Sequence, residues 1–226
     1  MSRPSDPQAR ARLLQAAERI FIARGLERAK VEDITKAAGL SKGAFYLHFR
    51  TKDDAFREIL SSALAELGAI LTEIETSRSV WGIAPHEELV ANWLEQDLRI
   101  FGCIWKHRPI MRLVLEGGGS PDYLHLIDLF AEGAQQTTER LVRWGVERGY
   151  YRKDLDPEQA AAFVAGGYDR LARRLVREKR KPNLERWLIG AHGLCFRALG
   201  TPEFIRAAAN LHAARLSESS PHKPAA

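Results

Sequence analysis

Residues 31–52 read VEDITKAAGLSKGAFYLHFRTK, and this stretch predicts two short helices joined by a tight turn. Its first part has apolar residues at helical spacing: Val31, Ile34, Ala37 and Ala38. Gly39 is expected to end this helix, because a residue without a Cβ readily takes the left-handed backbone found at helix ends. Ser41 is the expected N-cap of the second helix. The pattern is typical of a helix-turn-helix unit.

The second helix of this unit divides into an inward and an outward face. Phe45 and Phe49 are four residues apart and are expected to face the core. In a helix-turn-helix, the N-terminal residues of the second helix meet base edges in the major groove, while the first helix crosses the backbone. We therefore expect five residues to face the bases or the groove floor: Lys42, Gly43, Ala44, Tyr46 and Leu47.

Lys42 is the best candidate for a guanine contact, because its ammonium group can donate to the acceptors of guanine in the major groove. Gly43 costs the helix up to about 1 kcal/mol relative to alanine, a cost that fits a close approach of the backbone to DNA. Phosphate contacts are expected from four polar residues: Thr35, Ser41, His48 and Lys52. The alternatives are that Tyr46 is a half-buried packing residue and that His48 is structural.

The run AGLSKGAFYLHFRTKDDAF, residues 38–56, resembles the N-terminal DNA-binding domain of the TetR family of transcriptional regulators. The family pattern has an Ala-Gly turn, a Ser or Thr cap, an aromatic-Tyr-x-His-Phe core and a Lys at the next helix. The resemblance covers roughly residues 11–60. Two positions depart from it: Lys30 stands where the family usually has Thr or Ser, and Thr35 where it usually has Ala.

The resemblance implies an all-α fold, with an N-terminal three-helix helix-turn-helix DNA-binding domain and a C-terminal helical ligand-binding and dimerisation domain. We expect the first domain over residues 1–56, the second over 57–216 and a flexible tail over 217–226. In the family, the second domain usually holds an apolar cavity whose small-molecule ligand weakens DNA binding. The run RGYYRKDLDPEQAAAFV, residues 148–164, resembles the segment that leads into the family's dimerisation helices, so a homodimer is expected.

Positive charge is concentrated at the N-terminal end of the chain. The net charge is +5, and residues 1–57 hold 12 Lys and Arg against 7 Asp and Glu, whereas the remainder holds 22 of each sign. This excess suits a module that binds a polyanion, because phosphate neutralisation supplies most sequence-independent affinity. A solvated face is the alternative. With 45% hydrophobic residues and no apolar run near the ~20 residues that span a bilayer, a cytoplasmic protein without membrane contact is expected.

The sequence indicates no cofactor, metal site or disulfide framework. Cys103 and Cys195 are far apart and lack a CxxC spacing. The glycines at 117–119 are expected to form a turn, because no Gly-Lys-Ser/Thr follows them. An enzyme in the second domain would have to use Asp97, His107 or His125, but no nucleophile elbow or metal-ligand cluster accompanies them. We therefore expect no catalytic activity.

Helices are expected throughout the rest of the chain. Thr51 is the predicted N-cap of a long helix, with Asp54 completing a capping box. The stretch 76–85 interrupts the helical periodicity and is expected to be a connection. Pro109 is expected to break the helix that begins near His86, because proline cannot donate a backbone hydrogen bond.

Two sets of residues in the expected second domain are candidate binding surfaces. Asp97 lies on an aromatic stripe and needs a partner, which is either a cationic ligand group or an Arg or Tyr of this chain. The ligand-binding candidates are Trp93, Asp97, Phe101, Trp105, Tyr123, His125 and Phe130. Small and apolar residues on the two helices near 157–179 and 184–199 predict a symmetric four-helix dimer interface through Phe163, Gly167, Leu171, Trp187, Gly190, Ala191 and Leu194. The alternative is that the small residues pack only within one chain.

These features together predict a DNA-binding transcriptional regulator. The leading hypothesis is a homodimeric repressor that a small-molecule effector releases from a near-palindromic operator in double-stranded DNA. The same fold is compatible with an activator. A sequence-indifferent architectural DNA-binding protein is the alternative from another class.

Overall fold

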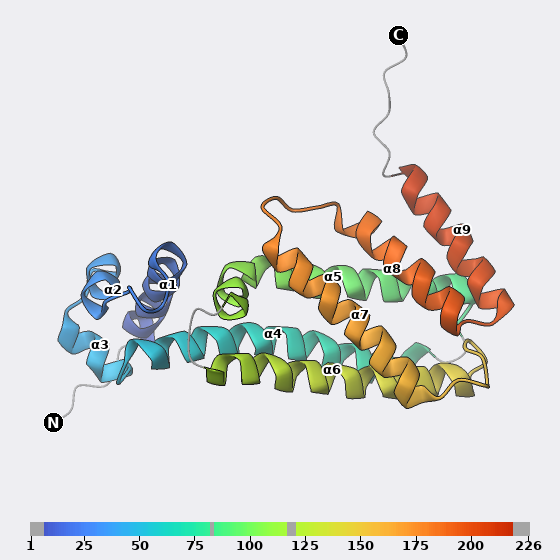
Figure 1. The fold of residues 1–226 in the computed structure, drawn as a ribbon, viewed down its shortest axis with the longest axis horizontal. Helices are drawn as coiled ribbons and strands as arrows, with labels where there is room; N and C mark the ends of the chain where they lie inside the picture. The colour runs from blue at the N-terminus through green and yellow to red at the C-terminus, as the bar shows by residue number, and fades with distance from the viewer. Residues whose placement is uncertain (1–6, 82–83, 117–120, 219–226) are drawn as a thin grey trace, which may run out of the picture. The chain divides into compact units, whose positions relative to one another are not determined.

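The computed structural model describes residues 7–81, 84–116 and 121–218, and these form helices joined by short loops (Figure 1). In chain order the helices are α1 (Pro7–Arg24), α2 (Val31–Ala38), α3 (Lys42–His48), α4 (Lys52–Trp81), α5 (His86–Leu115), α6 (Pro121–Glu147), α7 (Pro157–Arg177), α8 (Leu184–Leu199) and α9 (Pro202–Glu218). The predicted all-α class is confirmed. Within these ranges, each helix is too short or too polar to cross a bilayer.

The chain packs as two compact units. The first contains the described residues up to Glu66 together with Lys106–Phe130, and the second contains Leu67–Trp105 and the described residues from Ala131 onward. Helices α4, α5 and α6 each contribute residues to both units. The functional domains over residues 1–56 and 57–216 stay a prediction. Of the predicted tail, Ser217 and Glu218 belong to α9, and residues 219–226 lie outside the described ranges.

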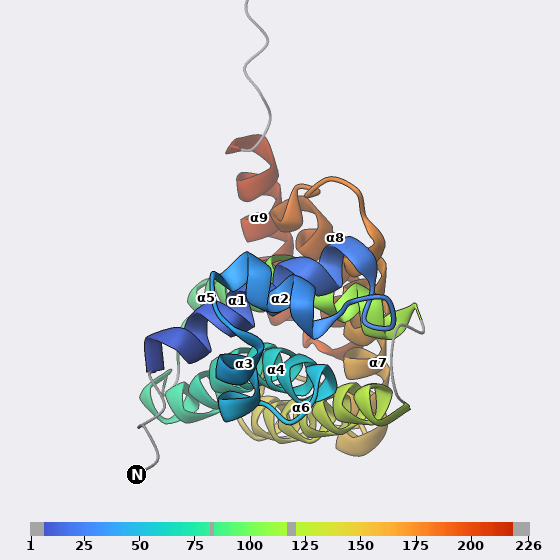
Figure 2. The ribbon, with the colours of Figure 1, turned by 90° about the vertical axis from the view of Figure 1, so that its left-hand side faces the viewer.

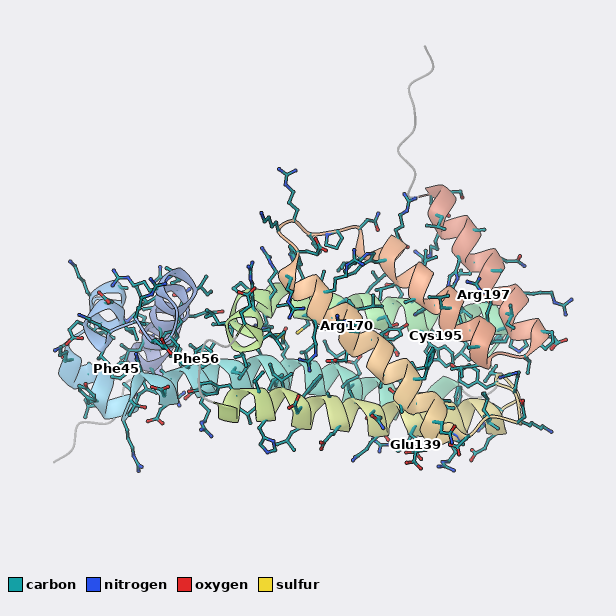
Figure 3. All side chains as sticks on the ribbon, viewed as in Figure 1. Phe45, Phe56, Glu139, Arg170, Cys195 and Arg197 are labelled. Carbon is teal, nitrogen blue, oxygen red and sulfur yellow. The ribbon has the colours of Figure 1, made fainter. Side chains whose placement is uncertain are left out.

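We call α1, α2, α3 and the start of α4 the head, and it is built around an aromatic core. Phe45 of α3 and Phe56 of α4 are both fully buried (Figure 3). The Phe56 ring meets that of Phe21 edge-on, with 5.4 Å between the ring centroids. Burying one such ring stabilises a fold by about 1.5–3 kcal/mol. In Figure 2 the short helices α2 and α3 of the head face the viewer.

The turn between α2 and α3 forms as the local sequence predicts. Gly39 has φ of 66°, in the left-handed region that favours glycine, and its amide bonds the carbonyl oxygens of α2. The Ser41 side-chain oxygen accepts a hydrogen bond from the Ala44 amide at 3.1 Å. At the start of α4, the Thr51 hydroxyl accepts from the Asp54 amide, and the Asp54 carboxylate accepts from the Thr51 amide, both at 3.1 Å. The predicted N-cap and capping box are confirmed.

The predicted interruption of the helix at residues 76–85 is wrong for residues 76–81, because α4 continues to Trp81. The Thr72 hydroxyl donates to the Gly68 carbonyl at 3.0 Å, and the Thr76 hydroxyl donates to the Thr72 carbonyl at 3.1 Å. Threonine side chains that bond the preceding turn are compatible with a helix interior. Residues 82 and 83 lie outside the described ranges.

The predicted break at Pro109 is also wrong, because this proline lies inside α5. Proline in a helix interior costs about 3 kcal/mol, since it lacks an amide hydrogen and crowds the preceding turn. Ile110 and Val114, which follow it, are buried in the aromatic core of the first unit. Their burial offsets the cost of the proline. The predicted turn at 117–119 lies outside the described ranges.

The second unit has an aromatic core of its own, with Trp93, Tyr151, Phe196 and Phe204 packed together at centroid separations of 5.1–5.8 Å. Tyr151 lies directly against Gly145 of α6. A Cβ atom placed on Gly145 would be 2.5 Å from Cδ2 of the Tyr151 ring, which is shorter than real carbon contacts. The absence of a side chain at residue 145 therefore makes room for the tyrosine ring.

Candidate nucleic-acid interface

One face of α3 consists of exposed side chains that the head does not need for packing. Tyr46 is 56% exposed and Leu47 is 66% exposed, although both carry large apolar groups. Lys42 and Gly43 are exposed at the start of the same helix, and a Cβ on Gly43 would meet only the Ser41 hydroxyl oxygen, at 3.7 Å. Ala44 is half-buried. This face therefore presents four different groups to solvent: the ammonium of Lys42, the uncovered backbone of Gly43, the phenol of Tyr46 and the aliphatic side chain of Leu47.

Lys42 forms an ion pair with Glu32 of α2. A hydrogen bond between these side chains lowers the pKa of Glu32 and raises the pKa of Lys42. Both side chains are 55% exposed, so water and salt screen their attraction. An acceptor on another molecule can therefore compete with Glu32 for the Lys42 ammonium group.

Two of the predicted phosphate contacts have their side chains engaged within the head. Thr35 is 4% exposed, and its hydroxyl donates to the Glu32 carbonyl at 3.1 Å, so it lies inside the head and not on its surface. Ser41 is exposed, but its hydroxyl oxygen caps α3. His48 is half-buried, with its ring centroid 6.3 Å from that of Phe49.

Lys52, the fourth predicted phosphate contact, is held by three backbone carbonyls. Its ammonium nitrogen donates to the oxygens of Leu26 at 2.7 Å, Glu27 at 2.8 Å and Ala29 at 3.0 Å. These carbonyls belong to the loop between α1 and α2. All three donors of the ammonium group are thus used to tie that loop to the first turn of α4.

Replacing Lys52 with methionine is expected to lower the free energy of unfolding by about 2 kcal/mol, because hydrogen bonds to a charged group contribute about 1.5–3 kcal/mol. Urea denaturation monitored by circular dichroism measures the change. Lys36→Met is the matched control, because Lys36 is an exposed lysine on α2 and its loss should change stability by less than about 0.5 kcal/mol. Equal stability of the two variants would show that the three bonds contribute nothing to the head.

Asp97 has a partner within the second unit. Its carboxylate lies 2.8 Å from Nε2 of His192, which is 2% exposed. Tyr168 is a further neighbour, and its pKa is raised well above the usual value by burial, by the negative charge of Asp97 and by a hydrogen bond to it. A cationic ligand group, an Arg or a Tyr of this chain was the expected partner of Asp97; Tyr168 agrees with the last of these, whereas the histidine was not predicted.

The surroundings of this pair contain buried polar atoms that lack a hydrogen-bond partner within the described ranges: Trp93 Nε1, His192 Nδ1 and His212 Nε2. The His192 and His212 rings lie 5.7 Å apart. Burial, with the charges of His192 and Arg197, lowers the pKa of His212 to about 4, so this imidazole is neutral at pH 7. Near the Asp97–His192 pair, the second unit thus combines aromatic rings with buried nitrogen atoms that have no hydrogen-bond partner among the described residues.

The predicted ligand-binding residues do not form one cluster. Phe101 packs against Tyr168 in the second unit, with 6.0 Å between ring centroids. Tyr123 instead belongs to the core of the first unit, where its ring lies 4.8 Å from that of Phe56. The remaining candidates divide in the same way: Trp93, Asp97 and Trp105 lie in the second unit, and exposed His125 and half-buried Phe130 lie in the first.

The predicted dimer surface is an exposed apolar area on α7 and α8. Phe163 is 71% exposed and Leu194 is 67% exposed, the two highest values among the large hydrophobic residues described. Gly167 and Gly190 are exposed, and a Cβ on either would meet open space. Of the remaining predicted contacts, Leu171 and Trp187 are half-buried and Ala191 is buried.

Residues 13–59 match the family model described as "Bacterial regulatory proteins, tetR family". The chain is 24% identical over 179 residues to the transcriptional repressor DhaR of Mycobacterium sp. (strain GP1), covering 79% of this chain and 88% of DhaR. It is 26% identical to the repressor KstR2 of Mycobacterium tuberculosis over 159 residues, covering 69% of this chain and 75% of KstR2.

Solved structures share the fold. SmeT, the repressor of the Stenotrophomonas maltophilia multidrug efflux pump SmeDEF, superposes with a TM-score of 0.66 at 22% identity, over 86% of this chain and 92% of that chain. A SmeT–triclosan complex gives a TM-score of 0.60 at 22% identity, over 87% and 93% of the two chains. The described residues therefore share the fold of SmeT.

Proposed function

Because this chain belongs to the TetR family of bacterial regulatory proteins, we propose that it is a homodimeric repressor released from a near-palindromic DNA operator by a small-molecule effector. The observation that carries the proposal is the exposed face of α3. Lys42, Tyr46 and Leu47 are exposed on a helix whose opposite side, at Phe45, is fully buried. This arrangement suits a helix that enters the major groove while its other side anchors it to the head.

Apolar exposure on α7 and α8 supports the homodimer. Phe163 and Leu194 are large apolar side chains that the single chain leaves mostly exposed, and an exposed apolar surface is typical of a site that contacts another protein chain. Two helices from each subunit would form a four-helix interface related by a twofold axis. The two heads would then occupy half-sites about 34–36 Å apart on one face of the duplex.

Release by an effector is supported by the relatives and by the chemistry of the second unit. SmeT has been solved with triclosan, which shows that a regulator of this fold accommodates an aromatic small molecule. Here, Trp93 Nε1 and His192 Nδ1 are buried beside aromatic rings and have unused hydrogen-bonding capacity among the described residues. An effector that binds better to the released conformation than to the DNA-bound one shifts the population toward release.

A footprint on genomic DNA upstream of the reading frame tests the proposal. The expected result is protection of one near-palindromic site, with affinity that falls steeply as salt rises while preference for that site persists. Uniform coating of all fragments with equal affinity would instead indicate a sequence-indifferent architectural protein. Titrating aromatic small molecules into the protected complex tests release.

The variant Lys42→Ala is expected to relax specificity at one base position of each half-site, by about 1–3 kcal/mol. The physical reason is that a lysine in the groove discriminates guanine through its N7 and O6 acceptors. Competition binding with operators substituted one base pair at a time measures the effect. Lys153→Ala, an exposed lysine of the second unit, is the control and should leave the base profile unchanged. If Lys42→Ala had the same base preferences as the parent protein, Lys42 would not contact the bases.

A further inference from the structure

An acidic side chain lies beside the cation to which the proposed function gives the reading of a base. Glu32 is in the first turn of α2, and its carboxylate pairs with the ammonium group of Lys42, the first residue of α3. The pair therefore joins the two short helices of the head across their turn (Figure 2). Each side chain is 55% exposed, so the pair lies on the surface of the head and not in its core.

The position of this carboxylate is unfavourable for binding DNA in general. A negative charge on a surface that meets a duplex repels the phosphates and offsets the positive charge that drives sequence-independent binding. Residues 1–57 otherwise carry the positive excess of the chain. An exposed ion pair also contributes little to folding stability, because water and salt screen it. Neither general affinity nor stability therefore explains an acidic residue at this place.

The next residue of α2 has a partner of a different kind. Asp33 pairs with Arg24, and this pair joins α2 to α1 within the head. The helix dipole favours acidic residues in the first turn of a helix, which accounts for the presence of both Glu32 and Asp33. It does not account for their partners. The partner of Asp33 belongs to the supporting helix, whereas the partner of Glu32 belongs to the exposed face of α3.

A lysine has to be held in place before it can discriminate between bases. Its ammonium group is a compact charge on a flexible stem, and fixing that stem costs rotamer entropy. An unrestrained lysine at a DNA surface can donate to phosphates, which position a protein but carry no sequence information. One of the three ammonium donors is enough for the bond from Lys42 to Glu32. The two that remain match the N7 and O6 acceptors of guanine.

We propose that Glu32 is a positioning residue for base reading, which keeps the Lys42 ammonium group at the start of α3 so that it donates to guanine and not to the nearest phosphate. This inference rests on the proposed function, because it requires α3 to enter the major groove. Glu32 lowers the affinity for all DNA and raises the preference for the operator. It thus determines specificity through Lys42, without contacting a base.

The variant Glu32→Gln tests the proposal in the full-length protein, because it removes the charge of the carboxylate and keeps the size of the side chain. Competition binding with operators substituted one base pair at a time should show about tenfold weaker discrimination at the position that Lys42→Ala also affects. Binding to a duplex of random sequence over a range of NaCl concentrations is the second measurement. The slope of log K against log salt should become steeper by about 1, because the released Lys42 neutralises one more phosphate.

Two further variants make the test specific. In the double variant Glu32→Gln/Lys42→Ala, the base preferences should equal those of Lys42→Ala alone, because Glu32 acts through Lys42. Glu27→Gln is the matched control, since it removes the same charge from an exposed residue of the loop between α1 and α2. It should keep the base preferences and the salt slope of the parent protein. Equal effects of Glu27→Gln and Glu32→Gln would reveal a general effect of charge and overturn the inference.

The remaining outcomes separate this inference from the proposed function. If Glu32→Gln kept the discrimination and the salt slope of the parent protein while Lys42→Ala relaxed specificity, only the positioning role of Glu32 would be wrong. A further change of base preference in the double variant would mean that Glu32 contacts DNA by itself, which also contradicts that role. If Lys42→Ala itself kept the base preferences of the parent protein, the positioning role of Glu32 and the reading role of Lys42 would both be wrong.

Discussion

The variant Leu194→Glu is expected to be a monomer in solution and to bind operator DNA about 100-fold more weakly than the parent protein. Leu194 is 67% exposed in the single chain, so a carboxylate there costs the folded monomer little. In a homodimer the same position would be covered, and an unpaired charge would be buried against apolar groups of the second copy. Loss of the dimer leaves each head to bind one half-site alone, without the gain of about 10²–10⁴ that linked binding provides.

Sedimentation velocity measures the oligomeric state of this variant, and an electrophoretic mobility shift measures its operator affinity. Phe163→Glu alters the neighbouring helix α7 at a residue that is 71% exposed, and it should give the same result. Leu129→Glu is the matched control, because Leu129 is 49% exposed on α6, a helix that contributes no residue to the predicted dimer surface. A dimeric Leu194→Glu variant with unchanged affinity would refute the assignment of this surface.

The second large effect is expected when one member of the Asp97–His192 pair is removed. Asp97→Ala should lower the free energy of unfolding by about 1–3 kcal/mol, because it leaves the buried His192 imidazole and the Tyr168 hydroxyl without their shared partner. His192 is 2% exposed and its Nδ1 atom has no partner among the described residues, so the imidazole would retain no hydrogen bond there. Urea denaturation monitored by tryptophan fluorescence measures the loss.

A double variant separates the cost of breaking the pair from the contribution of the pair itself. Asp97→Leu/His192→Leu replaces both groups with apolar side chains and should recover most of the lost stability, since such replacements are often neutral. Asp154→Ala is the control, because that carboxylate is 74% exposed and lies 3.8 Å from Arg152. If Asp97→Ala were as stable as this control, the pair would not stabilise the core.

Features that depend on neighbouring residues in the sequence could be predicted. The caps at Ser41 and Thr51 involve atoms three residues apart, and each side chain accepts the expected backbone hydrogen bond at 3.1 Å. The left-handed glycines at helix ends follow from the same local rules. The order and type of the elements were therefore largely accessible from sequence.

Features that depend on tertiary packing could not be predicted. The helix continues through Pro109 because the following apolar residues reach the core, a gain that local propensity does not include. Lys52 bonds carbonyls that are 23–26 residues earlier in the chain. Tyr123 was a ligand-binding candidate, but the packing places its ring against Phe56. Spacing along one helix shows which residues share a face and not what that face contacts.

The close fit between Gly145 and Tyr151 has a consequence for sequence divergence. The tyrosine ring occupies the space that any side chain at residue 145 would need, so neither residue can be exchanged freely while the other stays as it is. In related proteins a larger residue at the position of Gly145 is expected only where a smaller one stands at the position of Tyr151. An alignment in which the two positions vary independently would indicate that α6 and the segment after it are arranged differently in those relatives.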